Sequence, residues 1–339
     1  SMKKAILIVS FGTTYPETRQ KNIAAITRQV RALYPDVLVA EAVSSTIVRN
    51  AMKKREHIDA KSPEEGLLWL KEQGATHVAV FPTHVIDGIE NHRMKLAFEQ
   101  ITVADALLTE PEDYTNVAKA LWESLKEETG DAPLILMGHG TEHAADSSYA
   151  VMEQALRAYA QHPVYIATVE GKMTIADVIA QMKSEGIVNT RVVVAPFMLV
   201  AGEHANNDMA GEENSFASIL KKEGYTPECI LRGIAEYPAI REVYLSHLQK
   251  VAGALFADIT TQNRQGILYG IGIGSGNPKQ MTLQALEIIH SCDLIVLPAV
   301  TKEECYAYRI VEQVCPEISD MPLLCMPFPM IKDEKKLEL

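Results

Sequence analysis

The stretch LILMGHGTEH, residues Leu134 to His143, decides the fold of this chain. Its apolar start predicts a strand that crosses a buried core, and Gly138, His139 and Gly140 follow at once. Glycine on both sides lets the backbone turn sharply and approach a ligand closely. We therefore expect His139 at the carboxyl end of a strand, where open α/β sheets bind their ligands. A histidine satisfied by backbone groups in a tight turn is the alternative that this stretch alone leaves open.

A second stretch, RVVVAPFMLVAGEHANNDM from Arg191 to Met209, repeats this pattern. It predicts a strand, then a proline, a short apolar segment and a glycine that precede Glu203 and His204. The Asn and Asp residues that follow are expected to cap a helix. A second histidine is thus predicted just beyond the carboxyl end of a strand.

A third strand, VYIATVEG from Val164 to Gly171, carries Glu170 at its end. Together with His139 and His204, this carboxylate would form an open site for a borderline divalent metal, because such ions accept nitrogen and oxygen ligands. No single spacing here is specific for a metal. The prediction depends on the threefold recurrence of a metal-binding side chain after a strand.

The composition excludes several classes of partner. The 339 residues carry 32 basic and 44 acidic side chains, a net charge of −12, and the pI is near 5.4. This balance argues against nucleic acid or an anionic membrane as the main partner, whereas a local basic cleft could still bind an anionic small molecule. No apolar run reaches the roughly 18 residues of a membrane span. We therefore expect a cytoplasmic protein, and the five cysteines, none in a CxxC pair, are interpreted as buried thiols.

Strands and helices alternate along the first part of the chain. The expected strands are Ala5–Ser10, Val37–Ala42 and His77–Phe81. The expected helices are Pro16–Tyr34, Ser62–Gln73, one from about Glu90, and Asp113–Glu128. This alternation predicts an α/β fold with a parallel sheet covered by helices on both faces.

The same alternation of strands and helices begins again near residue 133, which indicates a duplication. AILIVSFGTT near the start resembles PLILMGHGTE, and HVAVFPTHVIDGIENH resembles RVVVAPFMLVAGEHAN. In this register Phe11 occupies the position of His139, and Glu90 that of His204. The metal chemistry is therefore assigned mostly to the second half, with Glu90 facing it across a cleft.

The strand-GHG turn, the TVEG strand end and the APFMLVAGEHANNDM loop resemble the anaerobic sirohydrochlorin cobaltochelatase family, within the class II chelatases. The similarity covers about residues 3 to 260. It implies two flavodoxin-like halves and ATP-independent insertion of Co(II), the substrate metal, into a sirohydrochlorin-type tetrapyrrole bound between them. It also implies that the metal ligands are His139, His204 and Glu170. The resemblance further implies that Glu90 corresponds to an acidic residue of the family that faces the macrocycle.

These residue types suit the insertion of a metal into a tetrapyrrole. A partly dehydrated metal must be held over the ring while two pyrrole N–H protons leave. Imidazole can bind the metal and also accept a proton near neutral pH, because its unperturbed pKa is about 6.5. We therefore interpret His139, His204 and Glu90 as catalytic. Two nitrogens and one oxygen leave coordination positions open, so the ion can be handed over.

Polar loops at two strand ends are expected to bind the carboxylates of the substrate. The first comprises Ser10, Phe11, Gly12 and Thr13 up to Thr14, and the second is Ser44–Thr46. Nearby basic residues could supply local positive charge, although a solvated helix face explains them equally well: Arg49, Lys53, Lys54 and Arg93. Several histidines show no partner pattern, which favours solvated or capping roles for them: His57, His162, His247 and His290.

The C-terminal part begins with GILYGIGIGSGN, Gly266 to Asn277, which predicts a strand that enters a glycine-rich loop. A helix over Pro278–Ser291 and a strand over Asp293–Pro298 follow. The run GIGSGNPKQMTLQA resembles the tetrapyrrole methyltransferases, most closely the cobalt-precorrin-2 C20-methyltransferase branch. It departs from that motif at Ser275 and Asn277, where proline and aspartate are usual.

The methyltransferase resemblance covers only about 75 residues. We therefore expect no methyltransferase activity from this chain, and S-adenosylmethionine as a cofactor only in a longer fusion product. The predicted organisation comprises two chelatase halves, the second with the metal ligands, and a partial methyltransferase-like module: residues 1–130, 131–262 and 266–339.

The sequence leaves several alternatives open. The expected partner is a tetrapyrrole substrate, with no nucleic acid and no membrane, and a homo-oligomer is compatible with the sequence. The same ligand set would also suit iron and, as a lesser alternative, nickel, or a carrier that binds a tetrapyrrole or metal without turnover.

Overall fold

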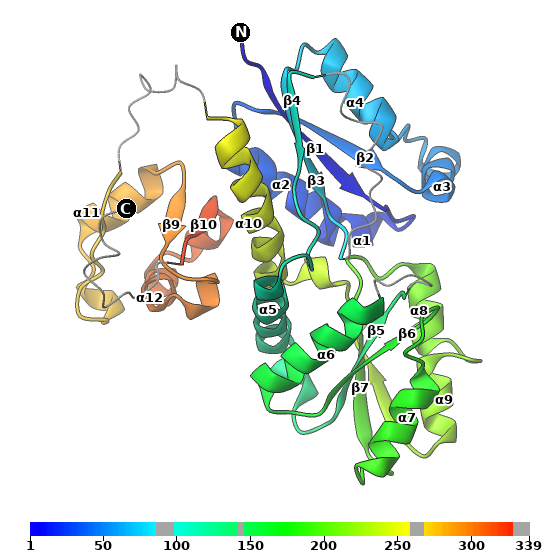
Figure 1. Cartoon of the computed structure of the whole chain (residues 1–339). Coiled ribbons are helices and arrows are strands. Elements are labelled where there is room, and N and C mark those ends of the chain that lie inside the picture. The colour runs from blue at the N-terminus through cyan, green and yellow to red at the C-terminus, as the bar shows by residue number, and fades with distance from the viewer. Residues whose placement is uncertain (86–97, 141–145, 258–267, 328–339) are drawn as a thin grey trace. The chain divides into compact units, whose positions relative to one another are not determined.

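The computed structural model describes residues 1–85, 98–140, 146–257 and 268–327, without the side chains of Asp146, Glu203 and His204. The chain forms two compact units, Ser1–Asp258 and Ile259–Leu339. The first unit contains both predicted sheets (Figure 1). Within the described residues, no helix is long and apolar enough to cross a membrane.

The two sheets of the first unit have the same topology. The first has the strand order β2-β1-β3-β4 and the second the order β6-β5-β7-β8, and all their strands are parallel. This is the order of the first four strands of a flavodoxin-like sheet. The strand bounds are β1 (Lys4–Ser10), β2 (Leu38–Val43), β3 (His77–Pro82), β4 (Gln100–Val103), β5 (Leu134–Gly138), β6 (Val164–Thr168), β7 (Arg191–Pro196) and β8 (Thr226–Cys229). The predicted duplicated α/β fold is confirmed.

Helices cover both faces of each sheet, as the continuous apolar strands predict. Ile6 and Ile8 of β1 enter one core cluster, whereas Leu7 between them enters another on the opposite face. Strand β5 divides in the same way, with Leu136 on one face and Met137 on the other. The helices are α1 (Pro16–Lys21), α2 (Ile23–Leu33), α3 (Thr46–Glu56), α4 (Pro63–Glu72), α5 (Pro111–Thr129), α6 (Asp146–Ala160), α7 (Ile175–Ser184), α8 (Glu203–Ala210), α9 (Phe216–Lys222) and α10 (Pro238–Leu255), with a 3-10 turn η2 (Ile234–Glu236).

Several helix predictions need correction. The long helix expected from about Glu90 lies outside the described residues up to 97, and Gln100–Val103, where it would continue, is strand β4 instead. The helix expected over Pro16–Tyr34 is interrupted at Asn22, a fully buried residue whose side chain donates a hydrogen bond to the Thr18 carbonyl at 2.8 Å. Asparagine competes for backbone hydrogen bonds in this way and favours breaks between helices. The Asn and Asp residues expected to cap a helix after His204 lie inside α8 instead, and Gly202 is its N-cap. The capping signal at Ser62 is confirmed, because a full capping box opens α4.

The two halves of the first unit exchange helices. Helix α5, which follows the first sheet in sequence, packs against α6 of the second half, and α10 packs back against β3 and β4 (Figure 1). One hydrophobic cluster therefore contains buried residues of both halves, such as Leu121 of α5 with Leu134 of β5. This shared core fixes the two sheets within one unit.

A buried ion pair joins the exchanged helices. His247 of α10 lies 2.8 Å from the Oδ1 atom of Asp113 in α5, and both side chains are buried. The other oxygen of Asp113 accepts hydrogen bonds from the backbone N–H groups of Thr109 (3.0 Å) and Glu110 (2.7 Å). The role of His247 is thus a buried pairing, and the solvated or capping role predicted for it is wrong.

The pair shifts both pKa values. Burial alone would lower the pKa of His247, but the hydrogen bond and charge of Asp113, with a contribution from Asp105, raise it above its usual range. Burial alone would raise the pKa of Asp113, but hydrogen bonds from His247 and from the backbone lower it.

The C-terminal unit has a small parallel sheet, β9 (Ile295–Leu297) with β10 (Leu323–Cys325). Its helical elements are η4 (Pro278–Gln280), α11 (Leu283–Ser291), η5 (Lys302–Glu304), α12 (Tyr306–Val314) and η6 (Pro316–Asp320). The strand expected to precede the glycine-rich loop is absent from the described residues 268–277. Leu268 is 89% exposed there, and Ile271 and Ile273 are only partly buried, so little burial offsets the entropy cost of ordering a stretch with alternating glycines.

We expect His247→Gln to destabilise the protein by about 3 kcal/mol, because it leaves Asp113 buried without its charged partner. A raised histidine pKa contributes stability fully below the unfolded value of about 6.5 and loses it as the pH rises through the folded value. A lowered aspartate pKa contributes stability above about 3.9 and loses it as the pH falls. The difference in unfolding free energy between wild type and H247Q should therefore be largest between about pH 4 and 6.5.

Urea unfolding at a series of pH values checks this window. Asp113→Asn, which removes the charge but keeps the shape, should show the same dependence on pH. A difference that stays constant from pH 5 to pH 9 would contradict the role of the charged pair.

Candidate functional site

Two predicted site residues, His139 and Glu170, lie just beyond the carboxyl ends of the paired strands β5 and β6. The register aligns Gly138 with Thr168. Beyond it, the Glu170 N–H donates to the His139 carbonyl at 3.0 Å. Because this hydrogen bond extends the ladder, His139 and Glu170 lie next to each other at the carboxyl edge of the sheet.

The side chains of these two residues converge. The Nε2 atom of His139 lies 3.6 Å from the Oε2 atom of Glu170, and each side chain is 65% exposed. Nitrogen and oxygen at this separation can bind one cation together, and their exposure leaves the other coordination positions to substrate or water. Two of the three predicted metal ligands, His139 and Glu170, therefore lie together.

Gly140 permits this arrangement because its backbone conformation and its surroundings exclude a side chain. Its φ is +82°, and a Cβ atom would lie 2.5 Å from the backbone nitrogen of Gly171 and 2.7 Å from the Thr168 Cβ. The β5 and β6 exit loops thus touch through their backbones. The N–H of Gly140 also donates to the buried Tyr149 hydroxyl at 3.3 Å.

His204 is placed by the loop between β7 and α8. It is the second residue of α8, and its side chain lies outside what the structure describes. Backbone hydrogen bonds support the loop: the Ile234 N–H donates to Met198 at 2.8 Å and the Ala235 N–H to Leu199 at 3.1 Å. Glu90, predicted to face the metal site, also lies outside the described residues.

The first half repeats the same backbone pattern with different side chains. The Ser45 N–H donates to the Phe11 carbonyl at 3.3 Å, just as the Glu170 N–H donates to His139. By this equivalence Phe11 takes the place of His139, as the sequence register predicts, and Ser45 takes that of Glu170. Phe11 is 63% exposed, which is unusual for an aromatic side chain and presents an apolar surface at the sheet edge.

The first-half loop reaches the second-half loop that carries His204. An added Cβ atom at Gly202 would lie 3.8 Å from the Thr13 Oγ1 atom. Gly12 has a φ of +101°, the counterpart of Gly140. The loops of the two halves therefore meet, as expected for a cleft with one wall from each half.

Ser10 and Thr13, predicted to bind the substrate, are almost fully buried. The Thr13 hydroxyl accepts a hydrogen bond from the Tyr15 N–H at 3.2 Å, and the Thr13 carbonyl accepts one from Arg19 at 2.9 Å. A cavity of about 390 Å³ beside β2 reaches Ser10, Gly12 and Thr13. The Thr13 side chain thus holds the loop in shape, and Phe11, 63% exposed, is the most exposed member of this set.

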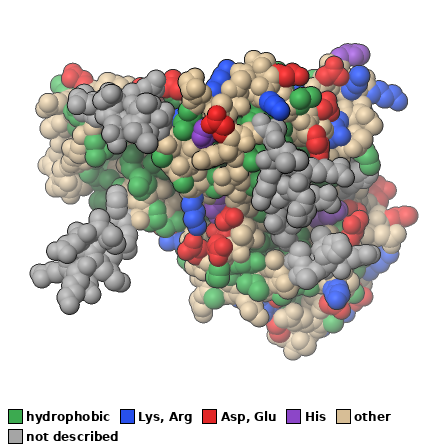
Figure 2. Space-filling model, turned by 45° about the horizontal axis from the view of Figure 1, so that its top comes forward, with side chains coloured by type: hydrophobic (Ala, Val, Ile, Leu, Met, Phe, Trp, Pro, Cys, Tyr) green, Lys and Arg blue, Asp and Glu red, His purple; other side chains and the backbone are tan. Residues whose placement is uncertain are grey.

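Arg49, expected as a positive charge for the substrate, also holds a loop. Its guanidinium donates to the carbonyls of Val43 at 2.6 Å and Ser44 at 3.0 Å, and to the Thr46 hydroxyl at 3.1 Å. Lys53 lies 3.6 Å from Asp59 in an exposed pair. Figure 2 shows basic and acidic side chains interspersed on the face it presents. Arg93 lies outside the described residues.

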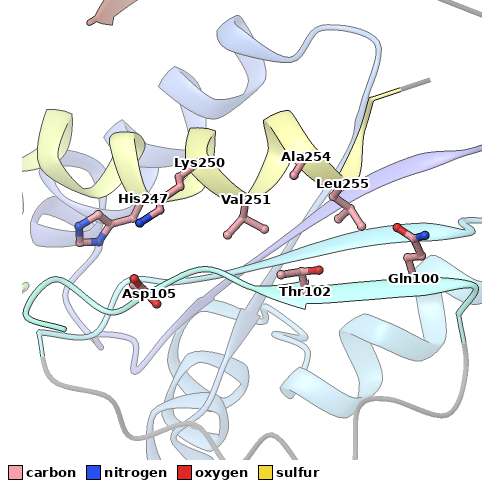
Figure 3. Close-up of a pocket in the computed structure, with 8 residues that line it drawn as sticks. All are labelled: Gln100, Thr102, Asp105, His247, Lys250, Val251, Ala254 and Leu255. Atoms are coloured by element: carbon pink, nitrogen blue, oxygen red, sulfur yellow. The ribbon is translucent and has the colours of Figure 1, made fainter. Parts of the chain in front are cut away.

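A second hollow lies between β4 and α10 (Figure 3). Its volume is about 400 Å³, and it is lined by polar and apolar side chains that include Thr102, Asp105, His247 and Lys250. Neither His139 nor Glu170 lines it. His247 already pairs with Asp113, so this hollow is distinct from the predicted metal site.

Comparison with known proteins identifies the family. A family model described as cobalt chelatase (CbiK) matches residues 4–253. The chain belongs to this family. It is 33% identical over 257 residues to the sirohydrochlorin cobaltochelatase of Salmonella typhimurium, a match that spans 74% of this chain and 96% of that protein. The resemblance read from the GHG, TVEG and APFMLVAGEHANNDM motifs is thereby confirmed.

A solved structure supports the fold of this cobalt chelatase family member. The structure of SirB from Bacillus subtilis with Fe3+ matches with a TM-score of 0.54 at 17% identity, covering 74% of this chain and 96% of that chain. At this identity the likeness concerns the fold alone.

The C-terminal part matches a second family model, tetrapyrrole (corrin/porphyrin) methylases, over residues 267–338. Over 72 residues the chain is 38% identical to a probable cobalt-precorrin-2 C(20)-methyltransferase from Methanocaldococcus jannaschii. This match spans 21% of the chain and 30% of that protein. The predicted fusion of a chelatase with part of a methyltransferase module is confirmed.

We expect Gly140→Ala to disrupt the site. The added methyl group would collide with the backbone at Gly171, and the alanine backbone would have to keep a positive φ. The unfolding free energy should therefore fall by more than about 2 kcal/mol. Gly186→Ala is a matched control, because Gly186 has a φ of +78° but nothing within 4 Å of an added Cβ. The control should lose only about 1 kcal/mol, from strain alone. Chemical denaturation of both variants checks the comparison, and equal losses would contradict the close approach of the two loops.

Proposed function

We propose that this chain inserts Co(II) into sirohydrochlorin, or into its relative in another oxidation state, without ATP. One observation carries the proposal: an imidazole and a carboxylate converge to 3.6 Å, both exposed, at the carboxyl edge of a parallel sheet in a cobalt chelatase family member. The S. typhimurium relative is named for this activity. The substrates are thus a metal ion and a tetrapyrrole.

His139, Glu170 and His204 would hold the incoming metal. Neutral imidazole nitrogen and carboxylate oxygen both bind borderline divalent ions, and the carboxylate offsets part of the metal's charge. Three protein ligands leave at least one position of a four-coordinate ion open. A pyrrole nitrogen of the macrocycle can therefore enter while the protein ligands still hold the ion.

Proton removal would use the same groups. Metallation releases two pyrrole N–H protons, and a base must lie within hydrogen-bonding distance of them. His139 at the open edge can accept one proton as its bond to the metal breaks, and Glu170, 3.6 Å away, can pass it to solvent. Glu90, predicted in the equivalent position to His204, is proposed as the acceptor on the opposite side of the macrocycle.

The first half would bind the macrocycle itself. Phe11 occupies the position of His139 and presents an exposed aromatic ring, and aromatic rings stack on flat π-systems. The backbone N–H groups and hydroxyls of the neighbouring loops would receive the substrate's carboxylates, so binding should weaken with salt. Duplicated loops thus take different roles, one for the metal and one for the ring.

We predict that His139→Ala and His204→Ala each lower metallation by a factor of about 100 or more, close to the protein-free rate, since each removes a ligand and a base. Absorbance of sirohydrochlorin mixed with Co(II), followed with and without protein, measures this rate. His57→Asn is the matched control, because His57 ends α3 with a φ of +56°, a conformation that asparagine tolerates.

The same assay separates the alternatives. A carrier would bind the tetrapyrrole yet leave the rate at the protein-free value, and an iron enzyme would favour Fe(II) over Co(II) in direct competition. If both histidine variants kept the wild-type rate while H57N did too, the assignment of the metal ligands would be wrong.

We predict that Phe11→Ala weakens binding of metal-free sirohydrochlorin about 5- to 10-fold, because ring stacking contributes roughly 1 kcal/mol. Fluorescence titration of the tetrapyrrole measures the change. Val188→Ala is a fitting control, because Val188 is 50% exposed but precedes β7 and so lies at the opposite edge of the sheet. An unchanged Kd for F11A would place the macrocycle elsewhere.

A further inference from the structure

A cluster of three potential metal ligands lies in the C-terminal unit, outside the site described above. It comprises His290, Cys315 and Glu317, whose ligand atoms all lie within 4.8 Å of one another. The Nε2 atom of His290 is 3.3 Å from the Sγ atom of Cys315. Such a set of nitrogen, sulfur and oxygen donors is absent from the proposed chelatase site, which has no thiol.

Regular structure positions each of the three residues. His290 lies in the last turn of α11, and Cys315 ends α12, its N–H donating to the Val311 carbonyl at 2.8 Å. Glu317 is the second residue of the η6 turn that follows Cys315. Cys315 is 1% exposed, whereas His290 and Glu317 are exposed, so the thiol forms the floor and the other two groups the rim.

The separations suit a small tetrahedral ion. With a metal–sulfur bond near 2.3 Å and a metal–nitrogen bond near 2.05 Å, tetrahedral ligand atoms lie about 3.6 Å apart. The His290–Cys315 separation of 3.3 Å is close to this value. Rotation of the exposed Glu317 side chain can bring its oxygen to a similar distance, because it needs no movement of buried atoms.

We propose that His290, Cys315 and Glu317 form a second metal site, which binds Zn(II) or Co(II) with a fourth position open to solvent. Mixed sulfur, nitrogen and oxygen donors select borderline divalent ions over Mg(II) or Ca(II). The Cys315 thiol, whose sulfur lies 3.3 Å from the His290 Nε2 atom, loses its proton to solvent when the ion binds. This site is independent of the chelatase activity.

Titration of the whole chain with Co(II), under a non-chelating reductant, tests the proposal. A thiolate ligand gives Co(II) a charge-transfer band in the near ultraviolet that nitrogen and oxygen ligands do not give, so the band separates thiolate ligation from the proposed chelatase site, and cysteine variants assign it to one thiol. Wild type should develop it to one equivalent, and His139→Ala should develop it equally. Cys315→Ser should lose the band. Cys292→Ser is the matched control, because it removes a half-buried thiol two residues from His290 and should keep the band.

Two exposed variants test the rim without disturbing the core. His290→Ala and Glu317→Gln should each raise the Kd for Co(II), read from the same band, by at least about tenfold, as loss of a ligand does. Thermal unfolding of both should match wild type. Absence of the band in wild type, its survival in C315S, or an unchanged Kd in both rim variants would each overturn the proposal.

Discussion

The site depends on one backbone hydrogen bond, from the Glu170 N–H to the His139 carbonyl, that continues a parallel ladder beyond its strands. Without it, two exposed side chains on separate loops would have no reason to converge. The close backbone approach of Gly140 to Gly171 completes this arrangement and explains why position 140 cannot carry a side chain. Because the geometry is set by main-chain atoms, the imidazole and the carboxylate can stay exposed and still keep a defined separation.

The first half has the equivalent main-chain hydrogen bond, but different side chains flank it. Ser45 bonds to Phe11 as Glu170 bonds to His139, so the fold offers two equivalent platforms at the carboxyl edges of two sheets. One presents a nitrogen and an oxygen, and the other presents an aromatic ring and a hydroxyl. A flat macrocycle needs an apolar surface, whereas its incoming metal needs donors. Divergence of a few side chains on a repeated scaffold can meet both requirements.

The two platforms are useful only if the halves keep a fixed relation, and the exchanged helices provide this. Helices α5 and α10 each pack on the half to which they do not belong in sequence, and their shared core is continuous. The buried pair of His247 and Asp113 lies where they meet. Removing either partner would leave a buried charge without its match, so any displacement of one helix against the other that separates the pair is costly.

The sequence by itself determined the central strands of both sheets, the order of the loops, the duplication and the family, because these depend on local apolar runs, glycines and short motifs. The edge strands β4 and β8 are only four residues long and partly buried, so no apolar run marks them. It also placed His139 and Glu170 at strand ends, and neighbouring parallel strands then bring them together. Only the tertiary structure decided which polar side chains are already engaged. His247 meets Asp113 across 134 residues, Arg49 turns back onto its own loop, and His290 reaches Cys315 across 25. The first and last of these contacts arise from how distant segments pack, which no local pattern records, and the Arg49 contacts depend on a loop conformation that the sequence does not specify.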